Sequence, residues 1–220
     1  MNIIIFPGGG SPYNQKYKEV YAILEKEASA YGYKNIVTLM YPGHIDENGK
    51  VEGKLNLDSS IEIAISKIQE YDSRGIQYDF LGRSYGTIVA VKTAISIKPR
   101  RLRKIILWGP PPYWIMWKLF VRDLKETIKT AEAKGLSVDE TFFSSLVPLE
   151  PMLEVLERPT VIATGTKDIY SQPAFIGYLK SSLSDKNNFF FKEVDGAPHE
   201  VTYNNCSKEV VTDYLNKLFT

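Results

Sequence analysis

Short apolar runs alternate along this chain with longer segments in which apolar residues recur every three or four positions. Six runs predict β-strands, at residues 3–6, 36–40, 78–81, 104–108, 160–163 and 189–191. Helical spacing predicts helices at residues 14–31, 87–97 and 207–218. A further predicted helix begins at a Ser59/Glu62 capping box. This alternation is typical of an α/β protein, with a mainly parallel sheet covered by helices on both faces.

One segment breaks the rhythm, between the predicted strands 104–108 and 160–163. It opens with Gly109 and three prolines, which neither continue a strand nor occupy a helix interior. A helical pattern follows, rich in tryptophan. We interpret residues 110–155, approximately, as a small helical lid inserted into a single domain of 220 residues. An ordinary crossover helix packed on the sheet is the alternative.

Residues 82–86 read Gly-Arg-Ser-Tyr-Gly, a G-x-S-x-G motif between a predicted strand and a predicted helix. A serine on such a turn projects its hydroxyl into the crevice above the sheet. The helix that follows directs its first amides at the same place, where negative charge develops during acyl transfer. Ser84 is therefore predicted to be a nucleophile, and the Tyr85 N–H an oxyanion donor.

A serine nucleophile needs a base, and the chain has only two histidines. His199 follows the last predicted strand, and His44 follows the second; both loops reach the same edge of the sheet. We predict His199 as the base because it follows an acid candidate in chain order. That acid is Asp168, after the fifth predicted strand, with Asp195 as its rival.

The second oxyanion donor is expected in the glycine run that follows the first strand. Without side chains, Gly8 and Gly9 let their backbone amides approach a ligand. Either one is a candidate, and the sequence does not choose between them. A nucleotide-binding loop is the competing interpretation, but Tyr13 stands where G-x-G-x-x-G needs glycine, and there is no G-K-[ST] lysine.

Taken together, the glycine run, the G-x-S-x-G motif, Asp168 and His199 resemble, in that order, the α/β-hydrolase superfamily. The resemblance spans nearly the whole chain and implies the α/β-hydrolase fold, with about six strands in the order 2-1-3-4-5-6. It implies that Ser84 is the nucleophile, Asp168 the acid and His199 the base. It also favours a non-catalytic role for His44, which lies in a Pro-Gly-His loop. Arg83 is unusual before the serine; it either pairs with a carboxylate or contacts substrate.

These residues predict a serine hydrolase of the carboxylesterase type, acting on an ester or thioester of a small to medium apolar acyl group. A peptidase, another acyl-transfer enzyme and a non-catalytic binding protein remain alternatives. Aromatic residues near the lid either line an acyl pocket or attach the lid to the body. The predicted substrate contacts are Tyr13, His44, Trp108, Tyr113, Trp114 and Trp117.

Composition limits the partners. The net charge of +1 gives no overall attraction to nucleic acid or to an anionic membrane. Cys206 is the single cysteine, so no intrachain disulfide forms, and no transmembrane span or signal segment is visible. We therefore expect a cytoplasmic protein with a small-molecule substrate, no metal and no cofactor. The sequence does not determine the oligomeric state.

Overall fold

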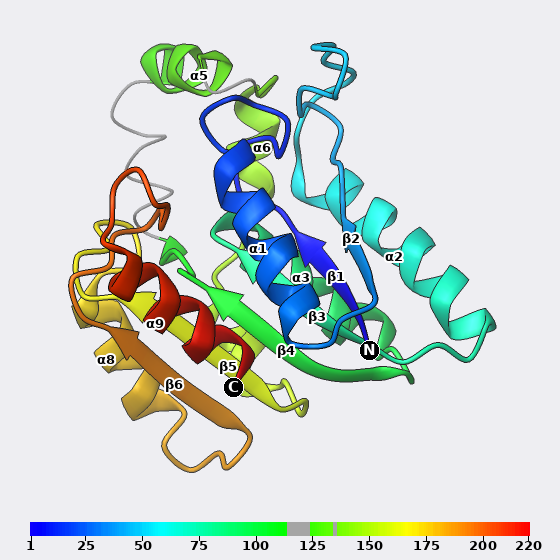
Figure 1. Cartoon of the computed structure of the whole chain (residues 1–220). Helices are drawn as coiled ribbons and strands as arrows, with labels where there is room; N and C mark the ends of the chain where they lie inside the picture. Colours follow the sequence, from blue (N-terminus) through cyan, green and yellow to red (C-terminus); the bar gives the residue numbers. More distant parts are fainter. Residues whose placement is uncertain (114–123, 134–135) are drawn as a thin grey trace.

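The computed structural model of the chain describes residues 1–113, 124–133 and 136–220. One sheet of six parallel strands runs through the molecule (Figure 1), in the order β2-β1-β3-β4-β5-β6. This is the order expected from the sequence. The strands are β1 (Asn2–Phe6), β2 (Asn35–Thr38), β3 (Tyr78–Arg83), β4 (Leu102–Trp108), β5 (Thr160–Gly165) and β6 (Phe189–Val194).

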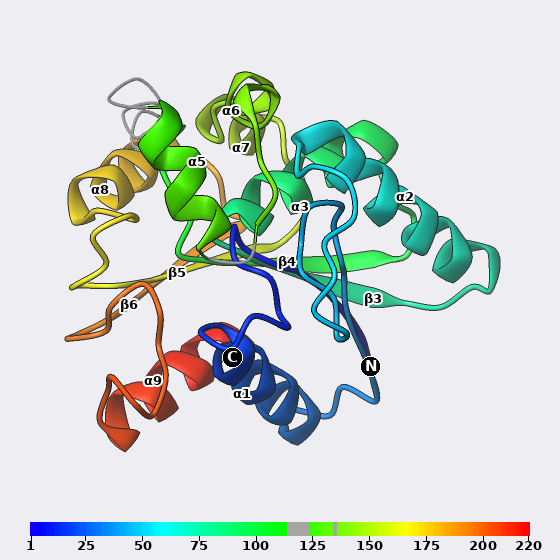
Figure 2. The same ribbon diagram turned by 90° about the horizontal axis from the view of Figure 1, so that it is seen from above.

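Helices cover both faces of the sheet (Figure 2). One face carries α1 (Lys18–Ala30) and α9 (Lys208–Phe219), and the other carries α2 (Leu57–Ser73), α3 (Tyr85–Ile97) and α8 (Pro173–Ser182). Alternate residues of a strand point to opposite faces. Accordingly, Phe80 belongs to the core under α2 and α3, whereas its neighbour Leu81 belongs to the core under α1 and α9.

Two helices differ from the expectation. α2 begins at Leu57, because the Asn56 side chain caps it by accepting a hydrogen bond from the Ser59 N–H at 2.8 Å. Ser59 thus lies inside the first turn, and the predicted Ser59/Glu62 capping box is wrong. α8 was not predicted, because it is only 10 residues long, contains Gly177 in its interior, and its start is marked only by Pro173 at the first helical position.

The segment between β4 and β5 contains α5 (Leu124–Glu132), α6 (Glu140–Ser145) and α7 (Glu150–Glu154). α6 buries Phe142 and Phe143, and α7 buries Leu153, whereas no residue of α5 is buried. Figure 1 shows α5 and α6 beyond the carboxyl ends of the strands. This part of the chain is therefore placed over the edge of the sheet where parallel α/β folds bind ligands.

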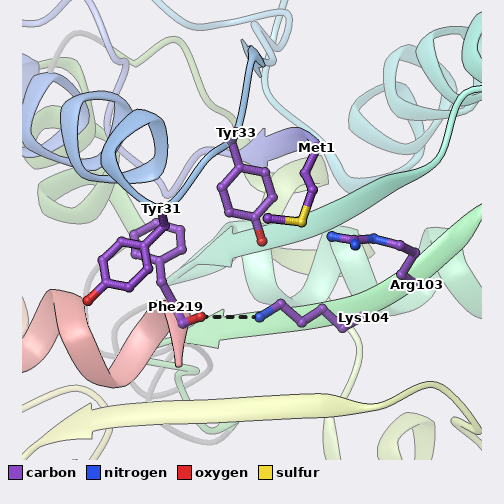
Figure 3. Close-up of a pocket in the computed structure, with 6 residues that line it drawn as sticks. All are labelled: Met1, Tyr31, Tyr33, Arg103, Lys104 and Phe219. Atoms are coloured by element: carbon purple, nitrogen blue, oxygen red, sulfur yellow. Dashed lines mark hydrogen bonds between the residues drawn. The ribbon is translucent and has the colours of Figure 1, made fainter.

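The amino ends of the strands are held by a buried polar network. Asp79 on β3 accepts two hydrogen bonds from the Arg103 guanidinium, at 2.9 and 2.6 Å, and a third from the Tyr33 hydroxyl at 2.5 Å. Beside it lies a hollow of about 260 Å³ (Figure 3), in which Lys104 Nζ donates to the Phe219 carbonyl oxygen. Both cations of this hollow are thus engaged by the protein itself.

No helix among residues 1–113, 124–133 and 136–220 is both long enough and apolar enough to cross a membrane.

Candidate active site

Ser84 lies between the last residue of β3 and the first of α3, with φ 50° and ψ −121°. A positive φ is unusual for a residue with a side chain and is found at strained functional turns. The two motif glycines make the turn possible: a Cβ on Gly86 would lie 2.0 Å from the Phe6 carbonyl oxygen, and one on Gly82 would lie 2.6 Å from the Gly86 oxygen. The sequence therefore builds a tight strand-to-helix turn with the serine at its apex.

A second polar pair lies at the same edge of the sheet. His199 Nδ1 is 2.8 Å from Asp168 Oδ2, and the two side chains are almost completely buried. The other Asp168 oxygen accepts hydrogen bonds from the Tyr170 and Ser171 N–H groups, both at 2.8 Å. The rival acid Asp195 is exposed and accepts instead from the Thr166 hydroxyl.

Electrostatics keep Asp168 ionised. Burial works against its charge, but the hydrogen bonds from His199 and the two backbone amides outweigh burial, so the pKa of Asp168 lies below its ordinary value. An anionic Asp168 fixes the proton of His199 on Nδ1. The other ring nitrogen, Nε2, is then an acceptor, the form required of a general base.

Gly109 supports this pair in a way that sequence reasoning missed. Its φ is 57°, and a Cβ there would lie 3.1 Å from both Asp168 Oδ2 and His199 Nδ1. The absence of a side chain at Gly109 thus leaves room for the Asp–His contact. The only sequence signal was the Gly-Pro-Pro-Pro run itself, which we interpreted as a boundary of the lid.

A cavity of about 580 Å³ opens at this edge and is bordered by both Ser84 and His199. The insertion supplies an apolar part of its wall together with the polar residues Glu126, Thr127 and Thr130. The rest of the wall comes from the glycine loop, from Tyr17 just before α1 and from the strand ends. The lining residues are Gly9, Gly10, Tyr17, Arg83, Ser84, Pro111, Glu126, Thr127, Thr130, Ala131, Leu136, Val138, Phe142, Phe143, Tyr170, His199 and Glu200.

Solved structures that resemble this one were then compared with it. A monoacylglycerol lipase from Paleococcus ferrophilus superimposes with TM-score 0.66 at 16% identity, covering 99% of this chain and 93% of that one. An esterase from Exiguobacterium antarcticum gives TM-score 0.68 at 14% identity, with 98% and 92% covered. A deformylase from Pseudomonas putida S16 gives 0.65 at 16% identity, with 97% and 91% covered.

The chain has the α/β-hydrolase fold. No protein-family model matches the sequence, and no curated protein sequence matches it either. Since the structural neighbours share so little sequence, they establish the fold and leave the reaction open.

The predicted oxyanion donors come from two places, the first residue of α3 and the glycine loop that follows β1. Tyr85 is the first residue of α3, where a helix offers its N–H no internal acceptor. The Gly8 N–H, however, donates to the Tyr21 hydroxyl at 2.8 Å and is therefore engaged. Gly9 borders the cavity, and a Cβ there would meet nothing within 4 Å. Of the two glycines left open by the sequence, Gly9 is the better placed.

His44 stands apart from the Asp–His pair. It is 3% exposed, and neither ring nitrogen finds a hydrogen-bond partner among the residues that the structure describes. Burial lowers the pKa of His44 to about 4, although the nearby Gly8 backbone opposes this shift. The imidazole is therefore neutral at neutral pH. It packs against Tyr41 at the base of the loop and is not part of the cavity lining.

The structure places the other predicted substrate contacts elsewhere. Trp108 is buried in the core under α1 and α9, its ring 5.2 Å from that of Tyr214, and it does not border the cavity. Tyr13 is exposed, and Tyr113 packs against the core under α2 and α3; neither borders the cavity. Trp114 and Trp117 lie outside the described residues. The apolar wall comes instead from Leu136, Val138, Phe142 and Phe143.

Arg83, next to the candidate nucleophile, is buried and borders the cavity. Its Cζ atom lies 5.4 Å from the ring centre of Trp108, 5.8 Å from that of Tyr17 and 6.0 Å from that of Tyr21. No carboxylate of the described residues forms an ion pair with it. The sequence left two roles open for Arg83, pairing with a carboxylate of the protein or contacting substrate. Among the described residues, the structure shows no ion pair for the first of these roles.

Within the described ranges, no group of three or more histidine, cysteine, aspartate or glutamate side chains is arranged to hold a metal ion.

Proposed function

We propose that this protein is a serine hydrolase that cleaves an ester or thioester of a small to medium apolar acyl group through an acyl-enzyme on Ser84. The observation that carries the proposal is the Asp168–His199 contact of 2.8 Å, with His199 and the strained Ser84 bordering one cavity. A buried, oriented histidine and a serine on a tight turn are the parts that acyl transfer requires.

In the proposed reaction, Ser84 Oγ bonds to the acyl carbon while His199 Nε2 takes the hydroxyl proton. The N–H groups of Tyr85 and Gly9 stabilise the oxyanion. The bond to the leaving group then breaks, and His199 returns its proton to the leaving oxygen or sulfur. A water molecule then attacks the acyl-enzyme: His199 Nε2 removes a proton from the water while the water oxygen bonds to the acyl carbon. The bond between the acyl carbon and Ser84 Oγ breaks, His199 returns the proton to Ser84 Oγ, and the carboxylic acid leaves.

Ionised Asp168 holds the imidazole in the required tautomer and stabilises the imidazolium that forms at each step. The apolar acyl group is assigned to the wall formed by Leu136, Val138, Phe142 and Phe143. We interpret the segment 110–155 as a lid over this cavity, because α5 and α6 supply lining residues such as Ala131 and Phe142.

The test is intact-mass labelling with a fluorophosphonate, on the wild-type chain and on Ser84→Ala. One adduct on the wild type, absent from Ser84→Ala, is expected. Ser144→Ala, a serine on the exposed side of α6 near the same cavity, is the matched control and should label like the wild type. An adduct that persists in Ser84→Ala, or no adduct on folded wild type, contradicts the proposal.

Hydrolysis of 4-nitrophenyl esters from acetate to decanoate, and of matching thioesters, then measures the acyl preference. We expect Phe142→Ala to shift that preference toward longer chains, since removing a ring enlarges the apolar end of the cavity. If the chain-length preference of Phe142→Ala equals that of the wild type, Phe142 does not line the acyl-binding part of the cavity. Cleavage of a peptide and no ester would favour the peptidase alternative.

A further inference from the structure

The cavity is asymmetric, and its polar end contains a cation that the proposed reaction does not use. Phe142 and Phe143 belong to the core under α2 and α3, whereas Tyr17 belongs to the core on the other face of the sheet, where Arg83 packs among aromatic rings. The two ends of the cavity therefore lie over opposite faces of the sheet, with Ser84 at the strand end between them.

Arg83 has hydrogen-bonding capacity that the described residues leave unfilled. Only 2% of the residue is exposed, and its Nε and Nη2 atoms are buried with no hydrogen-bond partner there. Burying a guanidinium without a carboxylate is unfavourable, and the surrounding aromatic faces recover only a part of the lost hydration. A buried cation with open donors, on the wall of a cavity and beside a candidate nucleophile, is placed to bind an anionic group in that cavity.

Two carboxylates border the cavity, Glu126 on α5 and Glu200 beyond β6. Glu200 forms an ion pair with Lys16 Nζ at 3.8 Å, so part of its charge is compensated. Arg83 is the only cation among the described lining residues. An anionic group of a substrate in this cavity therefore has one cationic partner, the Arg83 guanidinium.

We propose that Arg83 binds a carboxylate group of the substrate, so that the natural substrates are anionic esters or thioesters. A planar carboxylate matches the fork of donors on a guanidinium and can accept two of its hydrogen bonds. Arg83 immediately precedes Ser84, so the bound carboxylate lies within a few bonds of the cleaved carbonyl. The inference rests on the hydrolase function proposed above and specifies its substrate class.

Two substrate pairs test the inference, each with one anionic and one neutral member. Monomethyl and dimethyl glutarate differ in charge on the acyl side, and acetoxyacetate and acetoxyacetamide differ on the leaving-group side. The measured quantity is the ratio of kcat/KM for the anionic member to that for the neutral one, for wild type and Arg83→Met. This ratio is independent of the fraction of enzyme that is folded.

In at least one pair, we expect Arg83→Met to lower this ratio roughly 10- to 100-fold, the range for losing a charge-assisted hydrogen bond. Arg83→Lys keeps the charge but lacks the planar set of donors, so its ratio should lie between those of the wild type and Arg83→Met. Glu200→Gln, which removes the carboxylate at the same end, should raise the ratio. An equal loss for both members of both pairs would mean that Arg83 acts on the fold or on the oxyanion, and would overturn the inference.

Binding separates a failure of this inference from a failure of the proposed function. If no ester is cleaved, calorimetric titration with glutarate and with neutral glutaramide still reports on the site. Glutarate binding that weakens at least tenfold in Arg83→Met, with no binding of glutaramide, supports the carboxylate site even without hydrolysis. Equal binding of glutarate by both proteins, or none, excludes it.

Discussion

The two ends of strand β3 carry opposite charges on the same face, and the protein treats them differently. Asp79 at the amino end is completely buried and receives two hydrogen bonds from Arg103 and one from Tyr33. Arg83 at the carboxyl end is equally buried, yet two of its nitrogens have no partner among the described residues. One charge is satisfied within the fold; the other borders a cavity.

The comparison extends to the two buried carboxylates. Asp79 forms an ion pair with Arg103, which stays charged at all ordinary pH values. The hollow beside this pair is lined by Arg103 and Lys104, and both side chains bind groups of the protein itself. Asp168 is paired with His199, a group that can gain and lose a proton, beside a cavity of about 580 Å³. We therefore expect substitutions at the amino ends of the strands to change mainly stability. Substitutions at the carboxyl ends should change mainly activity.

The largest effect is expected from Asp168→Asn. On the proposed function, the amide cannot hold the His199 tautomer or stabilise its cation, so ester hydrolysis should fall roughly 10⁴-fold, the loss typical of Ser-His-Asp hydrolases. Kinetics at neutral pH with an ester found in the chain-length series measures it. A variant that retains more than a tenth of the wild-type rate would mean that Asp168 is not the orienting acid.

Asp79→Asn should show the reverse pattern. It leaves the Arg103 guanidinium without its carboxylate and should reduce the free energy of unfolding by about 3–4 kcal/mol, since breaking a buried pair strands a charge. Activity per folded molecule should be unchanged. Urea unfolding combined with fluorophosphonate titration of competent sites measures both quantities.

Arg83→Met is the matched control for Asp79→Asn on the same strand. It strands no carboxylate, so its effect on unfolding should stay below about 1.5 kcal/mol, or be favourable. If Arg83→Met destabilises the protein as much as Asp79→Asn does, both charges serve the fold and the contrast between the two ends disappears.

His44 provides a smaller, pH-dependent effect. Its pKa is about 4 in the folded chain and about 6.5 when unfolded, so between these values the unfolded state binds the extra proton. Stability is therefore lost as pH falls from about 6.5 to about 4, by at most about 3 kcal/mol in total. In His44→Gln this part of the acid sensitivity should vanish, as measured by urea unfolding at about pH 7.5 and about pH 5. An unchanged pH dependence would show that His44 is not buried as a neutral ring.

Periodicity predicted the six strands and four of the helices, because each of these elements buries a regular set of apolar side chains. The strand order came from the resemblance to the α/β hydrolases, since periodicity carries no information on which strands are neighbours. The start of α2 was missed because Asn56 and Ser59 are both good capping residues, and only the backbone hydrogen bond distinguishes them. α8 was missed because it is short and contains Gly177, which is a poor helix former.

Of the candidate site residues, some were assigned from the sequence and others were assigned to the wrong place. Ser84, Asp168 and His199 were assigned from a motif and from chain order, and their catalytic roles stay predictions that labelling and Asp168→Asn test. Trp108 shows where residue type misled: an aromatic side chain near a predicted lid belongs to the core on the far face of the sheet. Which face a strand-end residue occupies depends on its register, which apolar composition does not report.

By itself, then, the sequence determined the fold class and proposed the residues for acyl transfer, because both follow from local patterns along the chain. Only the tertiary structure decided the matters that depend on distance. These are the choice of Asp168 over Asp195 as the partner of His199, the engaged Gly8 amide, the Gly109 backbone packed against the Asp–His pair, and the missing partner of Arg83. The contacts involved join residues at least 13 positions apart in the sequence, and no local pattern encodes them.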